Sequence, residues 1–263
     1  MLALFDSGVG GLTVLAALWR RMPTQSFLYL SDQENFPYGD RPPADVRRDV
    51  ADFAALARRE GAEALVLACN TASALACDAA AAAFGRPVHG VIAPVARRIG
   101  PGRRVGVLAT TNTCRTHAYR DALAPRYVIE VACPDLIALA EAGGASDRDV
   151  ARAAAEPLRE LRLRGCDRVV LGCTHLPHFA EVLGRLTSDW AELVDPGEAL
   201  AAQLAAGAPR VGAGRLACAT TGDAAALRER LQEVLPQLAG RALVRSLRRA
   251  AGGLGFVDEG IGG

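Results

Sequence analysis

The chain has almost no net charge and no long hydrophobic run. It carries 30 basic and 29 acidic residues, so it has no field of one sign to attract nucleic acid or an anionic membrane surface. Apolar stretches such as 79–84 and 65–69 are far shorter than the roughly 20 residues that a membrane span needs. The N-terminal MLALFDSG is typical of a strand and lacks the features of an export signal. We therefore expect a cytoplasmic protein without a nucleic-acid or membrane partner.

Paired cysteines are also missing. The seven cysteines at positions 69, 77, 114, 133, 166, 173 and 218 include no CxxC pair. An odd number without such spacing favours reduced thiols over a disulfide framework. A chain of 263 residues is long enough for one large or two modest domains, each with its own core.

Two of these cysteines end similar apolar runs. The sequence reads LVLACNT at 65–71 and VVLGCTH at 169–175, and each run is typical of a parallel strand buried on both faces. Open α/β sheets bind ligands beyond the carboxyl ends of such strands, where a helix N-terminus lowers the pKa of a thiol. We predict that Cys69 and Cys173 are reactive and that the other five cysteines are structural.

Strand-like runs alternate with helical stretches along the chain. The expected strands are 2–5, 27–31, 65–68, 88–92, 105–108, 128–131 and 169–172. This alternation predicts mainly parallel sheets with flanking helices, an α/β fold. We expect 224–251 to be helical and the glycine-rich tail 252–263 to be mobile.

The repeated cysteine pattern also predicts a duplicated architecture. The segment 92–102 has two prolines and two glycines, which favours a domain crossing there. One cysteine pattern lies on each side of it. We therefore expect two similar α/β lobes related by a pseudo-twofold, 1–93 with 204–263 and 94–203, with the active site in the cleft between them.

The glycine-rich segment 8–13 after the first strand must be weighed as a dinucleotide-binding turn. Read from Gly8, the third glycine of GxGxxG becomes Thr13. Asp32 could imitate the ribose-binding acid, but Asp6 would place a negative charge near the pyrophosphate. The pattern disfavours a nicotinamide cofactor, and the glycines permit a tight turn.

Histidine sites give weaker patterns. Cys173, His175 and His178 form C-x-H-x-x-H, which matches none of the common structural zinc spacings, so we expect no metal. A hydrolase with a Cys/His pair stays open, because the sequence does not show which thiol faces which imidazole. It leaves the second cysteine unexplained. His89 and His178 favour surface or packing roles, and His117 is expected on a helix without an evident partner.

Two opposed thiols suit the removal of a proton from one face of a carbon and the return of a proton to the other face. One cysteine must then be a thiolate while the other is a thiol. Asp6 and His175 are candidate proton carriers beside them. The carbanion-like charge needs preorganised donors, and the candidates are Ser7, Asn70, Thr71, Thr110, Thr113 and Thr174.

Four motifs in order, DSGVGGLTV at 6–14, PYG at 37–39, ACNTAS at 68–73 and LGCTH at 171–175, resemble the glutamate racemase family of cofactor-independent enzymes. The resemblance implies that Cys69 acts on the D-enantiomer and Cys173 on the L-enantiomer, with Asp6 and His175 assisting. The substrate-binding residues that it implies include Ser7, Pro37, Tyr38, Gly39, Thr110 and Thr113, with Asp32 and Glu141 as acids near the site. It further implies a homodimer that supplies D-glutamate to a bacterial cell wall.

Several alternatives remain at this point. A racemase of aspartate or hydantoin would use the same two thiols, and a related decarboxylase would need only one of them. A binding protein with an inactive site is the alternative outside enzymes. The residues after Asp223 match the family poorly.

Overall fold

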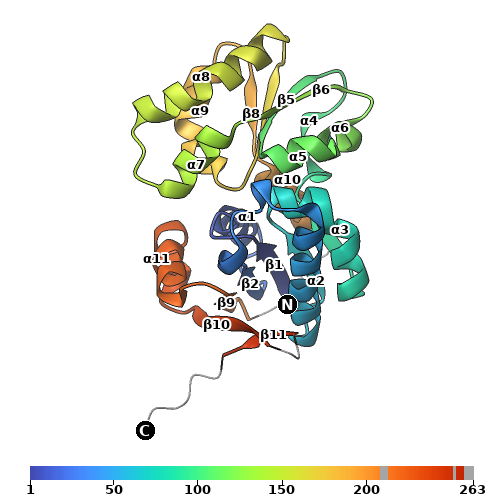
Figure 1. Ribbon diagram of the computed structural model, residues 1–263, viewed down its shortest axis with the longest axis vertical. Helices are drawn as coiled ribbons and strands as arrows, with labels where there is room; N and C mark the ends of the chain where they lie inside the picture. The colour runs from blue at the N-terminus through green and yellow to red at the C-terminus, as the bar shows by residue number, and fades with distance from the viewer. Residues whose placement is uncertain (208–212, 251–252, 258–263) are drawn as a thin grey trace.

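The protein is built from two sheets, one in each of two lobes (Figure 1). The computed structural model describes residues 1–207, 213–250 and 253–257. The first sheet has the strand order β11-β10-β9-β2-β1-β3-β4 and the second has the order β6-β5-β7-β8. Every strand pair is parallel except β10 with β11. The predicted mainly parallel α/β fold with two lobes is confirmed.

All seven predicted strands form, with ends that differ from the prediction by up to two residues. The first sheet contains β1 (Leu2–Asp6), β2 (Phe27–Ser31), β3 (Ala64–Leu67), β4 (Val88–Gly90), β9 (Leu216–Thr220), β10 (Leu243–Ala250) and β11 (Gly253–Phe256). The second contains β5 (Arg104–Ala109), β6 (Tyr127–Ala132), β7 (Arg168–Gly172) and β8 (Glu192–Val194).

The two lobes repeat one topology. The orders β2-β1-β3-β4 and β6-β5-β7-β8 are the same when each lobe is counted from its first strand, and this order is that of doubly wound folds. A cysteine of the duplicated pattern follows the third strand of each repeat within two residues. Phe5 pairs with Leu67 in one lobe, and Leu108 pairs with Leu171 in the other. The cysteines therefore occupy corresponding positions beyond the strand ends.

Helices cover the sheets and also join them. The α-helices are α1 (Leu12–Arg21), α2 (Pro43–Arg59), α3 (Asn70–Phe84), α4 (Pro94–Ile99), α5 (Thr111–Thr116), α6 (Ala118–Leu123), α7 (Pro134–Ala142), α8 (Asp147–Leu163), α9 (Ala180–Thr187), α10 (Pro196–Ala205), α11 (Ala224–Val234) and α12 (Pro236–Ala239). Three 3-10 turns, η1 (Gln33–Asn35), η2 (Tyr38–Asp40) and η3 (Leu176–Phe179), complete the described elements. Among the described helices, none has both the length and the apolar character needed to cross a membrane.

One apolar core runs through both lobes. Leu4 from the first sheet, Val170 from the second and Leu200 from α10 belong to the same buried cluster. Helix α10 packs against α1 and α4 and lies between the lobes in Figure 1. Separate clusters fill the outer face of each sheet. The shared core fixes the edge at which the two sets of strand ends meet.

The prediction of a helix over 224–251 is wrong in its second half. Helices α11 and α12 end at Ala239, and Leu243–Ala250 forms strand β10 beside β9. Val244 packs into the core shared by the lobes, whereas Leu247 packs into the core on the opposite face of the first sheet. A spacing of three places these two side chains on opposite faces of a strand. In the expected mobile tail, Gly253–Phe256 forms β11, and 252 with 258–263 lies outside the described residues.

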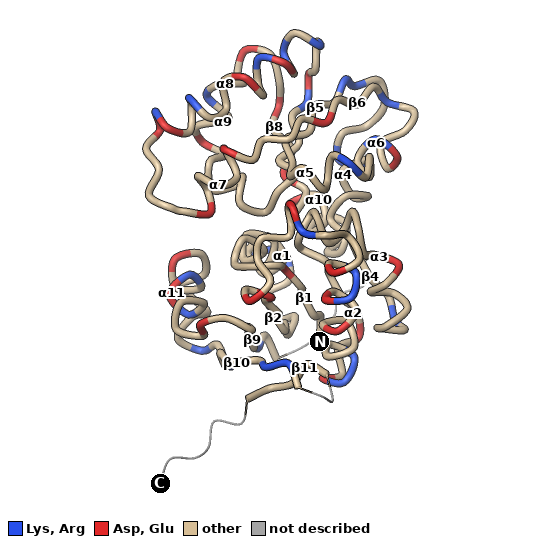
Figure 2. The backbone as a smooth tube through the Cα atoms, in the orientation of Figure 1, with Lys and Arg blue, Asp and Glu red and all other residues tan. Residues whose placement is uncertain are grey.

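Charges of both signs are spread over both lobes (Figure 2). Arg20 and Arg21 of α1 pair with Glu198 of α10, and Arg98 of α4 pairs with Glu192 of β8. These pairs are exposed, and such pairs contribute little to stability. The lobes are held together mainly by apolar packing.

Candidate active site

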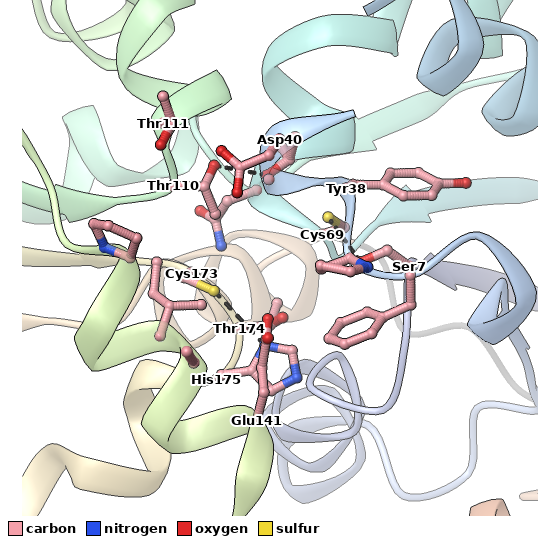
Figure 3. Close-up of a pocket in the computed structure, with 18 residues that line it drawn as sticks. Ser7, Tyr38, Asp40, Cys69, Thr110, Thr111, Glu141, Cys173, Thr174 and His175 are labelled. Atoms are coloured by element: carbon pink, nitrogen blue, oxygen red, sulfur yellow. Dashed lines mark hydrogen bonds and ion pairs between the residues drawn. The ribbon is translucent and has the colours of Figure 1, made fainter. Parts of the chain in front are cut away.

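A pocket of about 210 Å³ lies between the lobes, beyond the carboxyl ends of β1, β3, β5 and β7 (Figure 3). Its lining residues are Ser7, Phe36, Pro37, Tyr38, Gly39, Asp40, Cys69, Asn70, Thr71, Thr110, Thr111, Pro134, Ile137, Ala138, Glu141, Cys173, Thr174 and His175. The set holds hydroxyl, amide, thiol and carboxylate groups but no arginine. Both predicted reactive cysteines line it, one from each lobe.

Cys69 lies at the start of α3 and caps it. Its sulfur accepts a hydrogen bond from the Ala72 N–H at 3.4 Å and lies 3.5 Å from the Ser7 hydroxyl. The thiol is nevertheless buried, and burial together with the charge of Asp6 raises its pKa to about 11. The prediction of a lowered pKa is therefore wrong for Cys69, because desolvation outweighs the helix N-terminus.

Cys173 lies beyond β7 with an imidazole beside it. Its sulfur is 3.7 Å from Nδ1 of His175. Burial raises the pKa of the Cys173 thiol, and burial together with the positive charges of His178 and Arg230 lowers the pKa of His175 to about 4. This order of pKa values keeps the proton on the sulfur, and the neutral imidazole lies where it can hydrogen-bond with the thiol.

Asp6 lies behind the pocket wall. Its carboxylate is fully buried and accepts hydrogen bonds from the Gly8 N–H at 3.0 Å and from the Thr174 hydroxyl, in the other lobe, at 3.4 Å. Burial raises its pKa, and these donors act against that rise. Asp6 is therefore an interlobe contact and an electrostatic neighbour of Cys69.

The other predicted binding residues fall into two groups. Ser7, Pro37, Tyr38, Gly39, Asn70, Thr71, Thr110 and Thr174 line the pocket. Thr113 lies behind them, where its hydroxyl contacts Thr110 at 2.9 Å and Thr71 at 3.3 Å. Because Thr71 and Thr110 come from different lobes, these hydroxyls cross the interface.

The two predicted acids lie in different places. Glu141 lines the pocket 3.9 Å from Nδ1 of His175, and burial raises its pKa to about 7. Asp32 does not line the pocket. It is buried behind Tyr38 and accepts a hydrogen bond from the Tyr38 hydroxyl at 2.7 Å. Asp32 thus supports the wall and makes no contact with the cavity.

Several lining residues lie outside the motifs that the sequence shows. Phe36 and Asp40 flank the Pro37–Gly39 turn, and Thr111 follows Thr110. Pro134, Ile137 and Ala138 come from α7, where their spacing places them on one helix face with the predicted Glu141. That spacing is visible in the sequence, but it does not show what the face covers.

The glycine-rich loop and two histidines have structural surroundings that explain their patterns in the sequence. A Cβ at Gly10 would lie 2.5 Å from the Thr174 hydroxyl, and one at Gly11 would lie 2.6 Å from the Asp6 Cβ, so the glycines permit close packing around the site.

His178 lines a neighbouring cavity, and no metal-binding group of His, Cys, Asp or Glu occurs within the described residues. His117 lies between α5 and α6 at φ 55°, and its imidazole contacts Glu130 at 3.0 Å. The expectation that His117 lacks a partner is wrong, because β6 presents a buried carboxylate to it.

Comparison with known proteins agrees with this geometry. Residues 13–204 match the family described as Asp/Glu/Hydantoin racemase. The chain belongs to this family. A relative from Gloeobacter violaceus, named glutamate racemase, is 44% identical over 217 residues, which is 80% of this chain and 81% of the relative.

Solved structures extend the likeness of this family member over nearly its full length. Glutamate racemase isoform RacE1 from Bacillus anthracis superimposes with a TM-score of 0.87 at 28% identity, covering 94% of this chain and 97% of that one. The Francisella tularensis glutamate racemase, solved in complex with D-glutamate, gives 0.81 at 25% identity over 89% and 93% of the two chains. The family resemblance seen in the sequence is confirmed.

Proposed function

We propose that this racemase-family protein interconverts L- and D-glutamate without a cofactor, using Cys69 and Cys173 as the two bases. The observation that carries the proposal is that two buried thiols from opposite lobes line one pocket. The names of its similar relatives, glutamate racemase, support the substrate. It supplies D-glutamate to a bacterial cell wall.

The reaction moves two protons. A thiolate takes the proton from Cα, and the opposite thiol gives its proton to the other face of the resulting carbanion. Cys69 deprotonates D-glutamate and Cys173 deprotonates L-glutamate. Both thiols are protonated at neutral pH, so a thiolate must form before it can abstract a proton. His175 beside Cys173 and Asp6 near Cys69 are the groups that receive the thiol proton, and this transfer runs uphill because the pKa of each thiol is raised.

Neutral donors hold the substrate carboxylates. The Tyr119 hydroxyl donates to Oδ1 of Asn70 at 2.6 Å, which leaves the amide N–H₂ of Asn70 free to donate. The hydroxyls of Ser7, Thr71 and Thr110 line the same pocket. Fixed donors in a site that excludes water stabilise developing negative charge most effectively.

Solvent exchange tests the chemistry. Turnover in D₂O should place deuterium at Cα of the product enantiomer, because the thiol that donates the proton exchanges with solvent. Single Cys69→Ala and Cys173→Ala variants should then eliminate a leaving group from opposite enantiomers of a suitable substrate. Inversion without deuterium, or one enantiomer preference shared by both variants, would contradict the two-base mechanism.

Substrate choice is tested separately. Circular dichroism of the purified protein with L-glutamate and L-aspartate, side by side, should show loss of signal with glutamate. Loss with aspartate alone would favour the alternative racemase. No change with either would favour a binding protein with an inactive site.

Domain limits and assembly belong to the same proposal. We place 1–93 with 204–263 in one lobe and 94–203 in the other. Sheet membership supports this division, because strands of the first sheet lie within 2–90 and 216–256 and those of the second within 104–194. We propose a cytoplasmic homodimer, to be tested by sedimentation velocity.

A further inference from the structure

We infer that Asn112 is a positioning residue that holds the pocket wall between the two lobes. The wall in question is the segment 37–41, which includes the 3-10 turn η2. Asn112 does not line the pocket, and it is the second residue of α5, which begins beside the pocket. The expected effect on turnover rests on the proposed glutamate racemisation. The attachment of the wall by hydrogen bonds from Asn112, called the clamp below, does not rest on it.

The side-chain amide of Asn112 bridges both ends of the turn. Its Nδ2 donates to the carbonyl oxygen of Tyr38 at 3.0 Å and to that of Arg41 at 2.8 Å. Carbonyl oxygens only accept hydrogen bonds, so the N–H₂ group must face them. Asn112 belongs to α5 of the second lobe and is 4% exposed, while its partners belong to the first lobe. One buried amide therefore fixes the turn across the interface.

The clamped segment forms much of the pocket. Pro37, Tyr38, Gly39 and Asp40 all line it. A Cβ at Gly39 would lie 3.2 Å from the Cβ of Thr110, so the turn is seated closely on the start of α5. Within the first lobe, Arg41 pairs with Asp49 at 2.6 Å and lies over the Tyr38 ring. Side chains hold the segment to its own lobe, and Asn112 holds its backbone to the other.

The role of Asn112 is separable from substrate contact. The hydroxyls of Thr71 and Thr110 also meet across the interface, at 3.0 Å, but both line the pocket and would touch a ligand there. Asn112 hydrogen-bonds to the backbone of the wall and does not line the pocket. Its loss should therefore weaken binding more than it slows proton transfer.

Kinetics provide the first test. Asn112→Ala should raise KM about tenfold, the effect expected on losing hydrogen bonds to buried carbonyls, and change kcat less than about threefold. Asn112→Asp should have a higher KM than Asn112→Ala at pH 8, because its carboxylate faces two carbonyl oxygens. Lowering the pH protonates that carboxyl and returns one donor, so the KM of Asn112→Asp relative to wild type should fall. Thr187→Ala, which removes a buried hydroxyl that bonds within α9, is the control and should leave KM unchanged.

Thiol alkylation tests the clamp without substrate. Iodoacetamide should modify Cys69 and Cys173 faster in Asn112→Ala than in wild type, while Cys133, buried in the second lobe, should react at an unchanged rate. Unchanged alkylation of the two pocket cysteines would overturn the proposal, as would a fall in kcat with KM unchanged. If wild type fails to convert glutamate but alkylation accelerates, the proposed function is wrong and the clamp stands.

Discussion

At the two cysteines, burial and helix-end donors act on the thiol in opposite directions. Cys69 accepts a backbone hydrogen bond at a helix start, yet its pKa rises to about 11. Cys173 has an imidazole 3.7 Å away whose own pKa falls to about 4. The reactivity of each thiol therefore depends on its neighbours, which must take up its proton.

His175 is the neighbour whose removal should be most costly. His175→Asn removes the base beside Cys173, and kcat should fall about 10²- to 10⁴-fold, the usual contribution of a positioned base. His178→Asn is the comparison variant, since His178 lines the adjacent cavity and does not line the pocket with the two thiols. A circular-dichroism assay on both enantiomers measures the effect. Equal activity of the two variants would remove His175 from the mechanism.

Glu141 should make stability depend on pH. Burial raises its pKa from 4.5 to about 7, so the native state binds more protons than the unfolded state between about pH 4.5 and 7. The contribution of Glu141 to the free energy of unfolding is therefore greatest below this window and is lost as the pH rises through it. The urea midpoint of Glu141→Gln should fall less between pH 5 and pH 8 than that of wild type. Identical slopes would contradict the raised pKa.

At the scale of elements, the loop after β1 is shaped by contacts with the other lobe. Gly10 faces Thr174 and His175, and Gly11 faces Asp6 and Ala68. Because these glycines have no side chain, the loop can lie close to Asp6 and His175, two of the predicted catalytic residues. The same glycines suggest a dinucleotide turn in the sequence, because a close approach and a tight turn both need glycine.

Gly10→Ala should test this packing. The added methyl would lie 2.5 Å from the Thr174 hydroxyl and 3.0 Å from the His175 ring, so both must shift. We expect loss of activity of about 10-fold or more with only modest loss of stability. Gly240→Ala is the control, because nothing lies within 4 Å of its added Cβ. Full activity of Gly10→Ala would show that the loop accommodates the methyl group without disturbing the site.

At the scale of the whole molecule, a charge cluster ties strand β10, late in the chain, to α2 and to Asp32 in the N-terminal part of the same lobe. Arg249 of β10 lies 3.5 Å from Asp32, 3.2 Å from Asp49 and 2.6 Å from Asp52. Asp32 in turn accepts the Tyr38 hydroxyl, whose ring lines the pocket. A strand far along the chain thus supports the wall of the site.

Arg249→Met should destabilise the fold by about 3 kcal/mol, because it leaves the buried carboxylate of Asp32 without the cation beside it, whereas Asp49 keeps Arg41. This is the lower end of the usual range, since the Arg249 side chain is 28% exposed. Arg248→Met is the control, because Arg248 is exposed on the same strand and should change stability by less than about 0.5 kcal/mol. Urea unfolding gives both values. Equal midpoints would show that the cluster adds nothing.

The sequence alone determined the fold class, the two-lobe arrangement and the cysteine pair. Buried parallel strands need continuous apolar runs, and a ligand site beyond them needs polar residues at fixed positions. Both requirements are met by residues close together in the sequence, so the motifs LVLACNT and VVLGCTH show them. The site itself was also largely predictable, because most of its residues adjoin these motifs or the Pro37–Gly39 turn.

Only the tertiary structure decided which groups meet. The sequence does not predict the role of Asn112, because its partners are backbone carbonyls 71 and 74 positions away. Every residue has such a carbonyl, so the residue type does not show which one accepts a hydrogen bond. Asp32 is predicted near the site but lies behind Tyr38, because the sequence does not show which side chain separates it from the cavity. Strand β10 was read as a helix because its apolar spacing fits both, until pairing with β9 selects a strand. The raised thiol pKa values also depend on burial, which is set by the closure of both lobes around the pocket.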